Sequence, residues 1–99
     1  PTYHGLFWSV LTIWRGTDHQ QPADLKFIEK TEIVAPDGRV VAAGTNGPFS
    51  LQDSTYRQVN SLLFENIDFT HDGRYELRIT LTDEQNKVRV HKHYPILVV

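Results

Sequence analysis

Apolar and polar side chains alternate most regularly between Arg74 and Thr82. The apolar positions in this segment are Tyr75, Leu77, Ile79 and Leu81. A period of two is typical of a β-strand with one buried and one solvated face. The segment Lys87–Tyr94 follows after the polar turn Asp83–Asn86, so we predict that the two segments form an antiparallel hairpin.

Other stretches of the chain also carry strand-like patterns. Further strands are predicted at Leu6–Trp14, Leu25–Val34, Arg39–Ala43 and Ser61–Phe64. The segment Ser54–Phe69 is ambiguous, because Tyr56, Val59, Leu63 and Ile67 also fit a helical stripe. A strand is favoured there, since the side chains of Asn60, Ser61 and Asn66 compete for backbone groups in a helix.

Turn-forming clusters of Pro, Gly, Asn and Asp recur at regular intervals along the chain. Short strands between such turns predict an all-β protein. We expect one domain over residues 1–99, an antiparallel β-sandwich of about seven strands with Greek-key connections. The predicted core consists of Trp8, Val10, Leu25, Phe27, Ile33, Val40, Phe64, Ile67, Tyr75, Leu77, Ile79, Leu81, Val88 and Val90.

The segments Leu62–Ile67 and Asp72–Leu77 carry a resemblance that implies an immunoglobulin-like antiparallel β-sandwich. They are similar to the E-to-F corner of immunoglobulin-like sandwiches, and residues 24–99 resemble small stand-alone bacterial sandwich domains. The resemblance implies that Ile67 is the apolar corner residue and that the Tyr75 hydroxyl hydrogen-bonds back across the corner. Both sheet-bridging cysteines are missing, so antibody-like or receptor roles do not carry over.

The strand Leu6–Trp14 is apolar on both faces, which is unusual for a small sandwich with a single interior. Phe7, Leu11 and Ile13 lie on the face opposite to the predicted core residues. We predict that these three side chains form an interface, either in a homodimer or with a protein partner. The alternative is that the C-terminal segment Ile96–Val99 of the same chain covers them.

Aromatic side chains in the same region suggest a second use. An exposed pair of Trp8 and Trp14, with Tyr3, could stack against sugar rings in a carbohydrate-binding module. However, Trp8 and Trp14 share a strand face with Leu6 and Val10, and that face is more simply explained as core.

Two histidines two residues apart are the best candidates for a metal site. His91 and His93 project from one face of a strand, and with a four-residue turn Glu76 lies opposite His93. Arg78, then opposite His91, would repel a cation. A solvated polar face with a Glu76–His93 pair is therefore expected, and no metal is predicted. The carboxylates of Glu29 and Glu32 are likewise expected to be solvated.

Composition narrows the function further. Hydrophobic residues are 39% and charged residues 22% of the chain, as in folded globular proteins. A net charge of −2 argues against nucleic acid, and no apolar run is long enough for a membrane span. With no cysteine, nucleophile motif or phosphate-binding loop, we expect no cofactor and a non-enzymatic binding or assembly module. The chain also has no methionine, so we expect it to be processed or cut from a longer protein.

Overall fold

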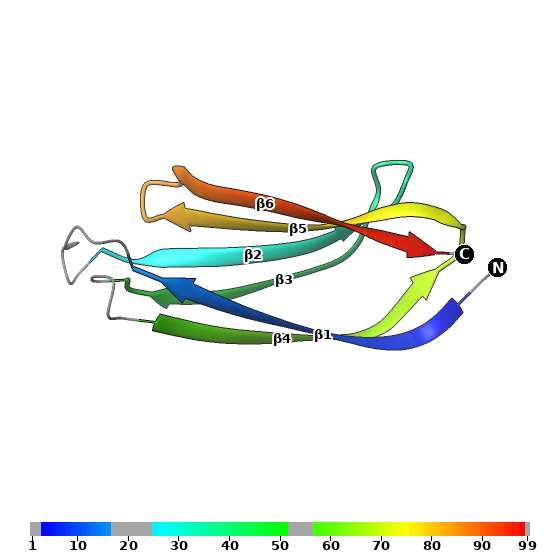
Figure 1. The fold of residues 1–99 in the computed structure, drawn as a ribbon, viewed down its shortest axis with the longest axis horizontal. Helices are drawn as coiled ribbons and strands as arrows, with labels where there is room; N and C mark the ends of the chain where they lie inside the picture. Colours follow the sequence, from blue (N-terminus) through cyan, green and yellow to red (C-terminus); the bar gives the residue numbers. More distant parts are fainter. Residues whose placement is uncertain (1–2, 17–24, 52–56, 99) are drawn as a thin grey trace.

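The computed structural model describes residues 3–16, 25–51 and 57–98, and in this part of the chain it contains six strands and no helix (Figure 1). The strands are β1 (Tyr3–Arg15), β2 (Phe27–Val34), β3 (Val40–Phe49), β4 (Arg57–Phe69), β5 (Gly73–Asp83) and β6 (Val88–Val98). The all-β prediction is therefore confirmed, with six strands in the described residues instead of about seven. None of the described residues belongs to a helix that is long and apolar enough to cross a membrane.

The strands form two antiparallel sheets that face each other as in a sandwich. One sheet has two strands in the order β1-β4, and the other has four in the order β3-β2-β5-β6. Figure 1 shows the two-stranded sheet as a separate layer below the four-stranded one. The body is elongated along the strands, with extents of 48 × 21 × 19 Å.

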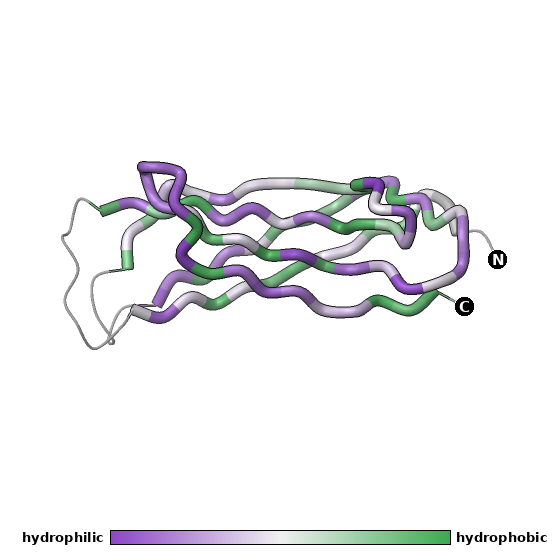
Figure 2. The backbone as a smooth tube through the Cα atoms, turned by 90° about the horizontal axis from the view of Figure 1, so that it is seen from above, coloured by the Kyte–Doolittle hydropathy of each residue, from purple (hydrophilic) through white to green (hydrophobic). Residues whose placement is uncertain are grey.

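The period of two decides which side chains face the interior. Hydrophilic and hydrophobic positions alternate along the strands in Figure 2. In β5, Tyr75, Ile79 and Leu81 are buried and Arg78 is exposed, as predicted. The ambiguous segment is a strand from Arg57 to Phe69, which is longer than predicted.

A bulge lets β4 keep both Phe64 and Ile67 inward although they are three residues apart. The pairing with β1 shifts between Trp8↔Phe64 and Leu6↔Ile67, so β4 carries one extra residue there. Asn66 lies in this bulge with a φ of 57°, in the left-handed region that asparagine tolerates better than most residues.

The core between the sheets divides into two clusters of buried side chains. The larger one contains Val10, Ile33, Ala35, Phe64, Ile67, Phe69, Tyr75 and Val98. The smaller one contains Phe27, Phe49, Leu51 and Leu81. Two residues were wrongly predicted to lie in the core: Val40 is 47% exposed and Val88 is 56% exposed.

The β5–β6 turn explains the error at Val88. Asp83 pairs with Lys87 through the Asp83 N–H, which donates to the Lys87 carbonyl at 3.0 Å, so the turn has one residue fewer than predicted. Asn86 adopts a φ of 61°, the conformation that closes a three-residue hairpin turn. The Asp83 carboxylate accepts the Gln85 and Lys87 N–H groups, and these bonds hold the pKa of Asp83 below its usual value.

The corner between β4 and β5 has the geometry that the sequence predicted. Tyr75 is fully buried, and its hydroxyl donates to the His71 carbonyl at 3.0 Å. Its ring meets the Phe69 ring edge-on, with 4.8 Å between the centroids. Ile67, the predicted apolar corner residue, is 2% exposed. These contacts fix the path of the chain from one sheet to the other.

Candidate interaction surface

The face of β1 that points away from the core is apolar and uncovered. Phe7 is 70%, Leu11 65% and Ile13 63% exposed. The alternate residues Val10 and Thr12 point inward. The structure therefore places the three predicted interface residues together on one outer face.

Strand β4 extends this face with two further apolar side chains that the sequence analysis did not single out. Val59 pairs directly with Ile13, and Leu63 pairs with Ser9. Both apolar side chains are 57% exposed. We call the set Phe7, Leu11, Ile13, Val59 and Leu63 the outer patch. In the sequence, the contribution of β4 is marked only by the apolar residues Val59 and Leu63 at odd-numbered positions. Their place on the outer face follows only when this segment is known to be a strand.

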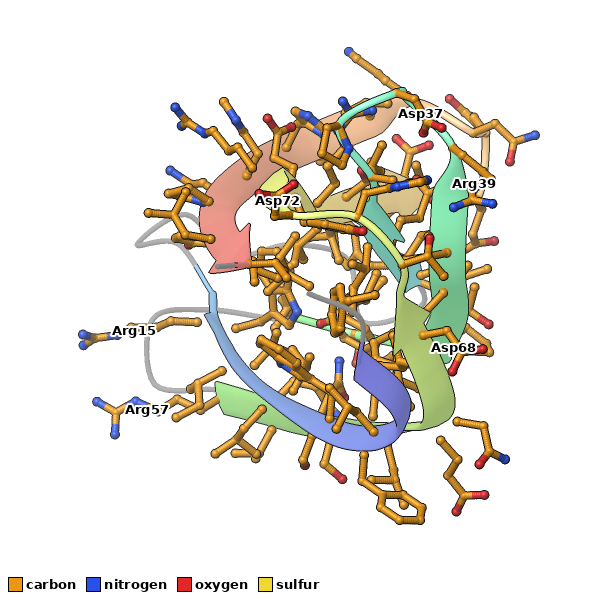
Figure 3. All side chains as sticks on the ribbon, turned by 90° about the vertical axis from the view of Figure 1, so that its right-hand side faces the viewer. Arg15, Asp37, Arg39, Arg57, Asp68 and Asp72 are labelled. Carbon is orange, nitrogen blue, oxygen red and sulfur yellow. The ribbon has the colours of Figure 1, made fainter. Side chains whose placement is uncertain are left out.

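Charged side chains lie at opposite ends of the outer patch. Arg57 pairs with Arg15 across the two strands at one end, and Figure 3 shows both side chains projecting from the same end of the sheet. Glu65 lies exposed toward the other end of β4, eight positions along the chain from Arg57. One end of the patch is therefore basic and the other acidic.

The alternative prediction, that the C-terminal segment of the same chain covers this face, is wrong. Val98 belongs to the buried core, and Ile96 packs against it from the inner side. The described part of the C-terminal segment is thus on β6 in the other sheet and leaves Phe7, Leu11 and Ile13 uncovered.

The two tryptophans face the interior. Trp8 packs against Phe69 with 6.1 Å between the ring centroids, and the Trp14 indole N–H donates to the Glu29 carboxylate. They are partly buried and do not form an exposed flat pair, so the geometry does not favour sugar stacking. The side chain of Tyr3, the third predicted sugar-binding residue, lies outside the described residues.

Glu29 is the main polar feature that sequence reasoning misjudged. It was expected to be solvated, but it is only 1% exposed. Its Oε2 atom accepts hydrogen bonds from Trp14, from the Thr12 hydroxyl at 2.6 Å and from the Asn60 amide at 3.2 Å. Because these donors come from β1 and β4, the carboxylate of Glu29 on β2 joins the two sheets at this point.

The histidine pair lies on the outer face of the four-stranded sheet with ordinary surface contacts. The register differs from the prediction, since His93 pairs with Arg78 and His91 with Thr80. Glu76 still approaches His93 diagonally, at 3.7 Å, and the Arg78 guanidinium that donates to Glu76 lowers the pKa of this carboxyl. Among residues 3–16, 25–51 and 57–98, no three His, Cys, Asp or Glu side chains are close enough together to hold a metal ion.

No family model matches the chain, and comparisons with curated proteins and with solved structures find no match. Function is therefore inferred from the geometry of the chain itself.

Proposed function

We propose that this chain is a non-enzymatic assembly module that forms a homodimer through the outer patch. One observation carries the proposal. Five large apolar side chains on one face of the two-stranded sheet are each at least 57% exposed. Contiguous apolar surfaces of this kind mark interaction sites, whereas single exposed apolar residues need no explanation.

The energetics favour a weak, concentration-dependent dimer. Fully burying a large apolar side chain is worth about 1.5–3 kcal/mol by transfer free energy, before the cost of association. Seven residues of strand span roughly 23 Å, and two strands are roughly 10 Å wide. The footprint, about 230 Å² on each partner, is well below the roughly 800 Å² per partner of a standard specific interface, so we expect a weak dimer that dissociates in the high micromolar range.

The charges at the two ends support a second copy as the partner. In a two-fold dimer, each patch meets its own inverted copy. An antiparallel arrangement of the two β4 strands brings Arg57 of one copy toward Glu65 of the other. The patch is thus self-complementary in charge, while a parallel arrangement would place like charges together.

We also infer that the sandwich is immunoglobulin-like. The buried Tyr75, whose hydroxyl bonds to His71, supports this inference, since it has the form of a tyrosine corner. The similarity to bacterial sandwich domains remains a proposal based on the sequence pattern.

Sedimentation velocity across micromolar concentrations tests the assembly. We expect the wild-type chain to be dimeric at the upper end of this range and Leu11→Asp to be a folded monomer, because the substitution places a charge in the middle of the interface. The matched control is Leu97→Asp, since Leu97 is 72% exposed but lies on β6, outside the patch. This control should dimerise like the wild type.

Charge reversal in the same series reports the orientation. Arg57→Glu should weaken the dimer, and the double variant Arg57→Glu/Glu65→Arg should recover it. A wild-type chain that stays monomeric throughout, or Leu11→Asp and Leu97→Asp affecting assembly equally, would contradict the proposal.

A further inference from the structure

The two sheets are unequal, and this leaves part of the interior uncovered. Two strands face four, and β4 closes one side by packing against β3. On that side Leu62 lies so close to Gly44 that an added Cβ would come within 2.8 Å of it. On the other side, β1 lies opposite β2, where Thr12 bonds to Glu29. Since β5 and β6 follow β2 in the larger sheet, their inner faces extend beyond β1.

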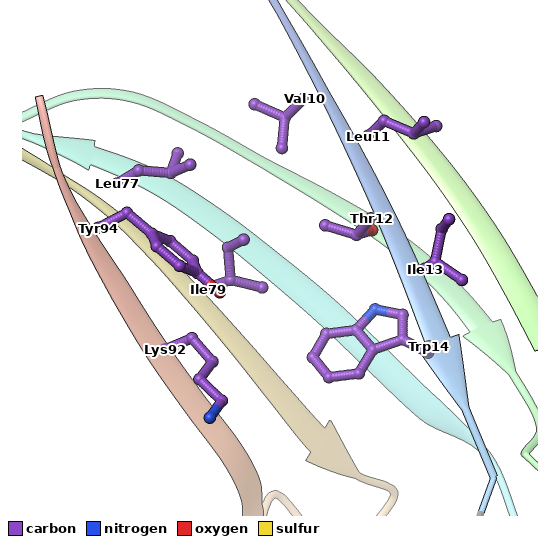
Figure 4. A pocket seen from close by; sticks show the side chains of 9 residues that line it. All are labelled: Val10, Leu11, Thr12, Ile13, Trp14, Leu77, Ile79, Lys92 and Tyr94. Atoms are coloured by element: carbon purple, nitrogen blue, oxygen red, sulfur yellow. The ribbon is translucent and has the colours of Figure 1, made fainter.

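An elongated cleft lies on this open side, between β1 and the β5–β6 pair. It has a volume of about 390 Å³. Figure 4 shows Val10, Thr12 and Trp14 pointing into it from β1, opposite Leu77 and Ile79 from β5 and Tyr94 from β6. Tyr94 is 51% exposed even though it pairs with Leu77 on the inner face. These are side chains of a sandwich interior that lack a covering strand.

The edge of β1 along this cleft is suited to pairing. Among the described residues, β1 has a hydrogen-bonded neighbour on one side only, namely β4. Residues Trp8–Trp14 pair with β4 in regular register, and every second residue of such an edge strand directs its N–H and C=O groups outward. This stretch contains no proline or charged residue, the usual features that protect an edge.

Lys92 gives the cleft a preference for a negatively charged group. It pairs with the buried Ile79, so it stands on the inner face of β6 and lines the cleft. No ion pair joins it to a carboxylate within the described residues. An acidic side chain in the cleft would complement this ammonium group.

Antiparallel, two-fold pairing with a second copy is unfavourable at this edge. If its own sheet continued from β1, its four-stranded sheet would occupy the space into which β5 and β6 project. A lone strand avoids this collision, because adjacent strands are only about 4.8 Å apart.

We propose that the cleft binds an extended polypeptide segment, which adds to β1 as a further strand. Its inward side chains are apolar, with one acidic side chain facing Lys92. The segment completes the smaller sheet and covers Leu77 and Tyr94. Leu11 and Ile13 of the outer patch also line this cleft, but Figure 4 shows their side chains on the other side of β1 from Val10 and Thr12. The two sites therefore share the β1 backbone and use opposite faces of the strand.

Fluorescence anisotropy with synthetic peptides of about nine residues, a typical strand length, tests the proposal. The probe is TVTVTETVT, in which valines and one glutamate share a face. Its partner TVTVTKTVT carries lysine instead, and TVTVPETVT has a central proline that interrupts strand pairing. We expect the glutamate peptide to bind the wild-type chain about tenfold or more tightly than the lysine peptide, and the proline peptide to bind least.

Variants of the protein locate the binding. Lys92→Glu should reverse the preference between the two charged peptides. The matched control Lys30→Glu should not, because Lys30 is exposed on β2 and lines none of this cleft. Failure of the glutamate peptide to bind, or a preference unchanged in Lys92→Glu, overturns the proposal. Leu63→Asp, which changes the outer patch on β4 and lines none of this cleft, should bind the peptide normally, so failure here is distinguishable from failure of the dimer.

Discussion

Replacing Tyr75 by alanine is expected to lower the free energy of unfolding by about 3–5 kcal/mol, the range for truncating a buried aromatic residue. The side chain is fully buried and contacts Phe69 edge-on, so its loss leaves a cavity where β4 passes into β5. Because domains of this size have a total stability of about 5–15 kcal/mol, the substitution should remove between about a fifth and all of it.

Tyr75→Phe separates the ring from the hydroxyl. It keeps the packing and removes the hydrogen bond that the hydroxyl donates to the His71 carbonyl and the longer one that it accepts from the His71 N–H at 3.4 Å, so we expect a loss of about 0.5–1.5 kcal/mol. Urea denaturation at one fixed protein concentration measures both variants. If Tyr75→Ala were as stable as Tyr75→Phe, the corner would not be a central element of the fold.

Replacing Glu29 by leucine is the second substitution with a large expected effect. The change leaves Trp14, Thr12 and Asn60 without their shared acceptor. A buried donor that loses its partner costs about 1–3 kcal/mol, and of these donors Asn60 is buried while Thr12 and Trp14 are partly buried, so we expect a loss of about 2 kcal/mol or more. Glu29→Gln should lose less, since an amide oxygen can still accept some of these bonds.

Glu32→Leu is the matched control for this experiment. Glu32 lies three residues along the same strand, is more exposed and forms a surface pair with Lys30 at 3.8 Å. It should change the urea midpoint little, because exposed ion pairs contribute only about 0–1 kcal/mol. Equal effects of Glu29→Leu and Glu32→Leu would show that the Glu29 cluster does not hold the sheets together.

Elements whose pattern is local were predictable from the sequence. The alternation around Leu77 and Ile79 fixes both the strand and its buried face. Tyr75 was assigned correctly because its position just after an Asp-Gly turn is a local signature. In each case a few neighbouring residues carry the information.

Features that depend on the partner strand were not predictable in the same way. The predicted register of β6 was wrong by two positions, because Asn86 adopts a left-handed conformation that shortens the turn by one residue and a bulge between Leu81 and Thr82 shifts the pairing by one more. Glu29 shares the inward face of β2 with Phe27 and Ile33, so its burial had a signal in the period of two. The donors that satisfy it come from β1 and β4, and no local pattern identifies them.

The outer patch was only partly predictable from the sequence. The apolar odd-numbered residues of β1 predicted an uncovered face, and this arrangement is present. The contribution of Val59 and Leu63 depended on recognising β4 as a strand and on its register with β1. Neither pattern identifies a partner for this face.

Protection of a single engineered thiol tests the dimer most directly, since the chain contains no cysteine of its own. Ser9 is exposed between Phe7 and Leu11 on the outer face, and Ser9→Cys places a thiol within the patch. Its rate of alkylation should fall as the protein concentration rises through the micromolar range. The control Arg78→Cys, on the outer face of the other sheet, should react at a constant rate. Equal, concentration-independent rates at both positions would contradict an interface on the outer patch.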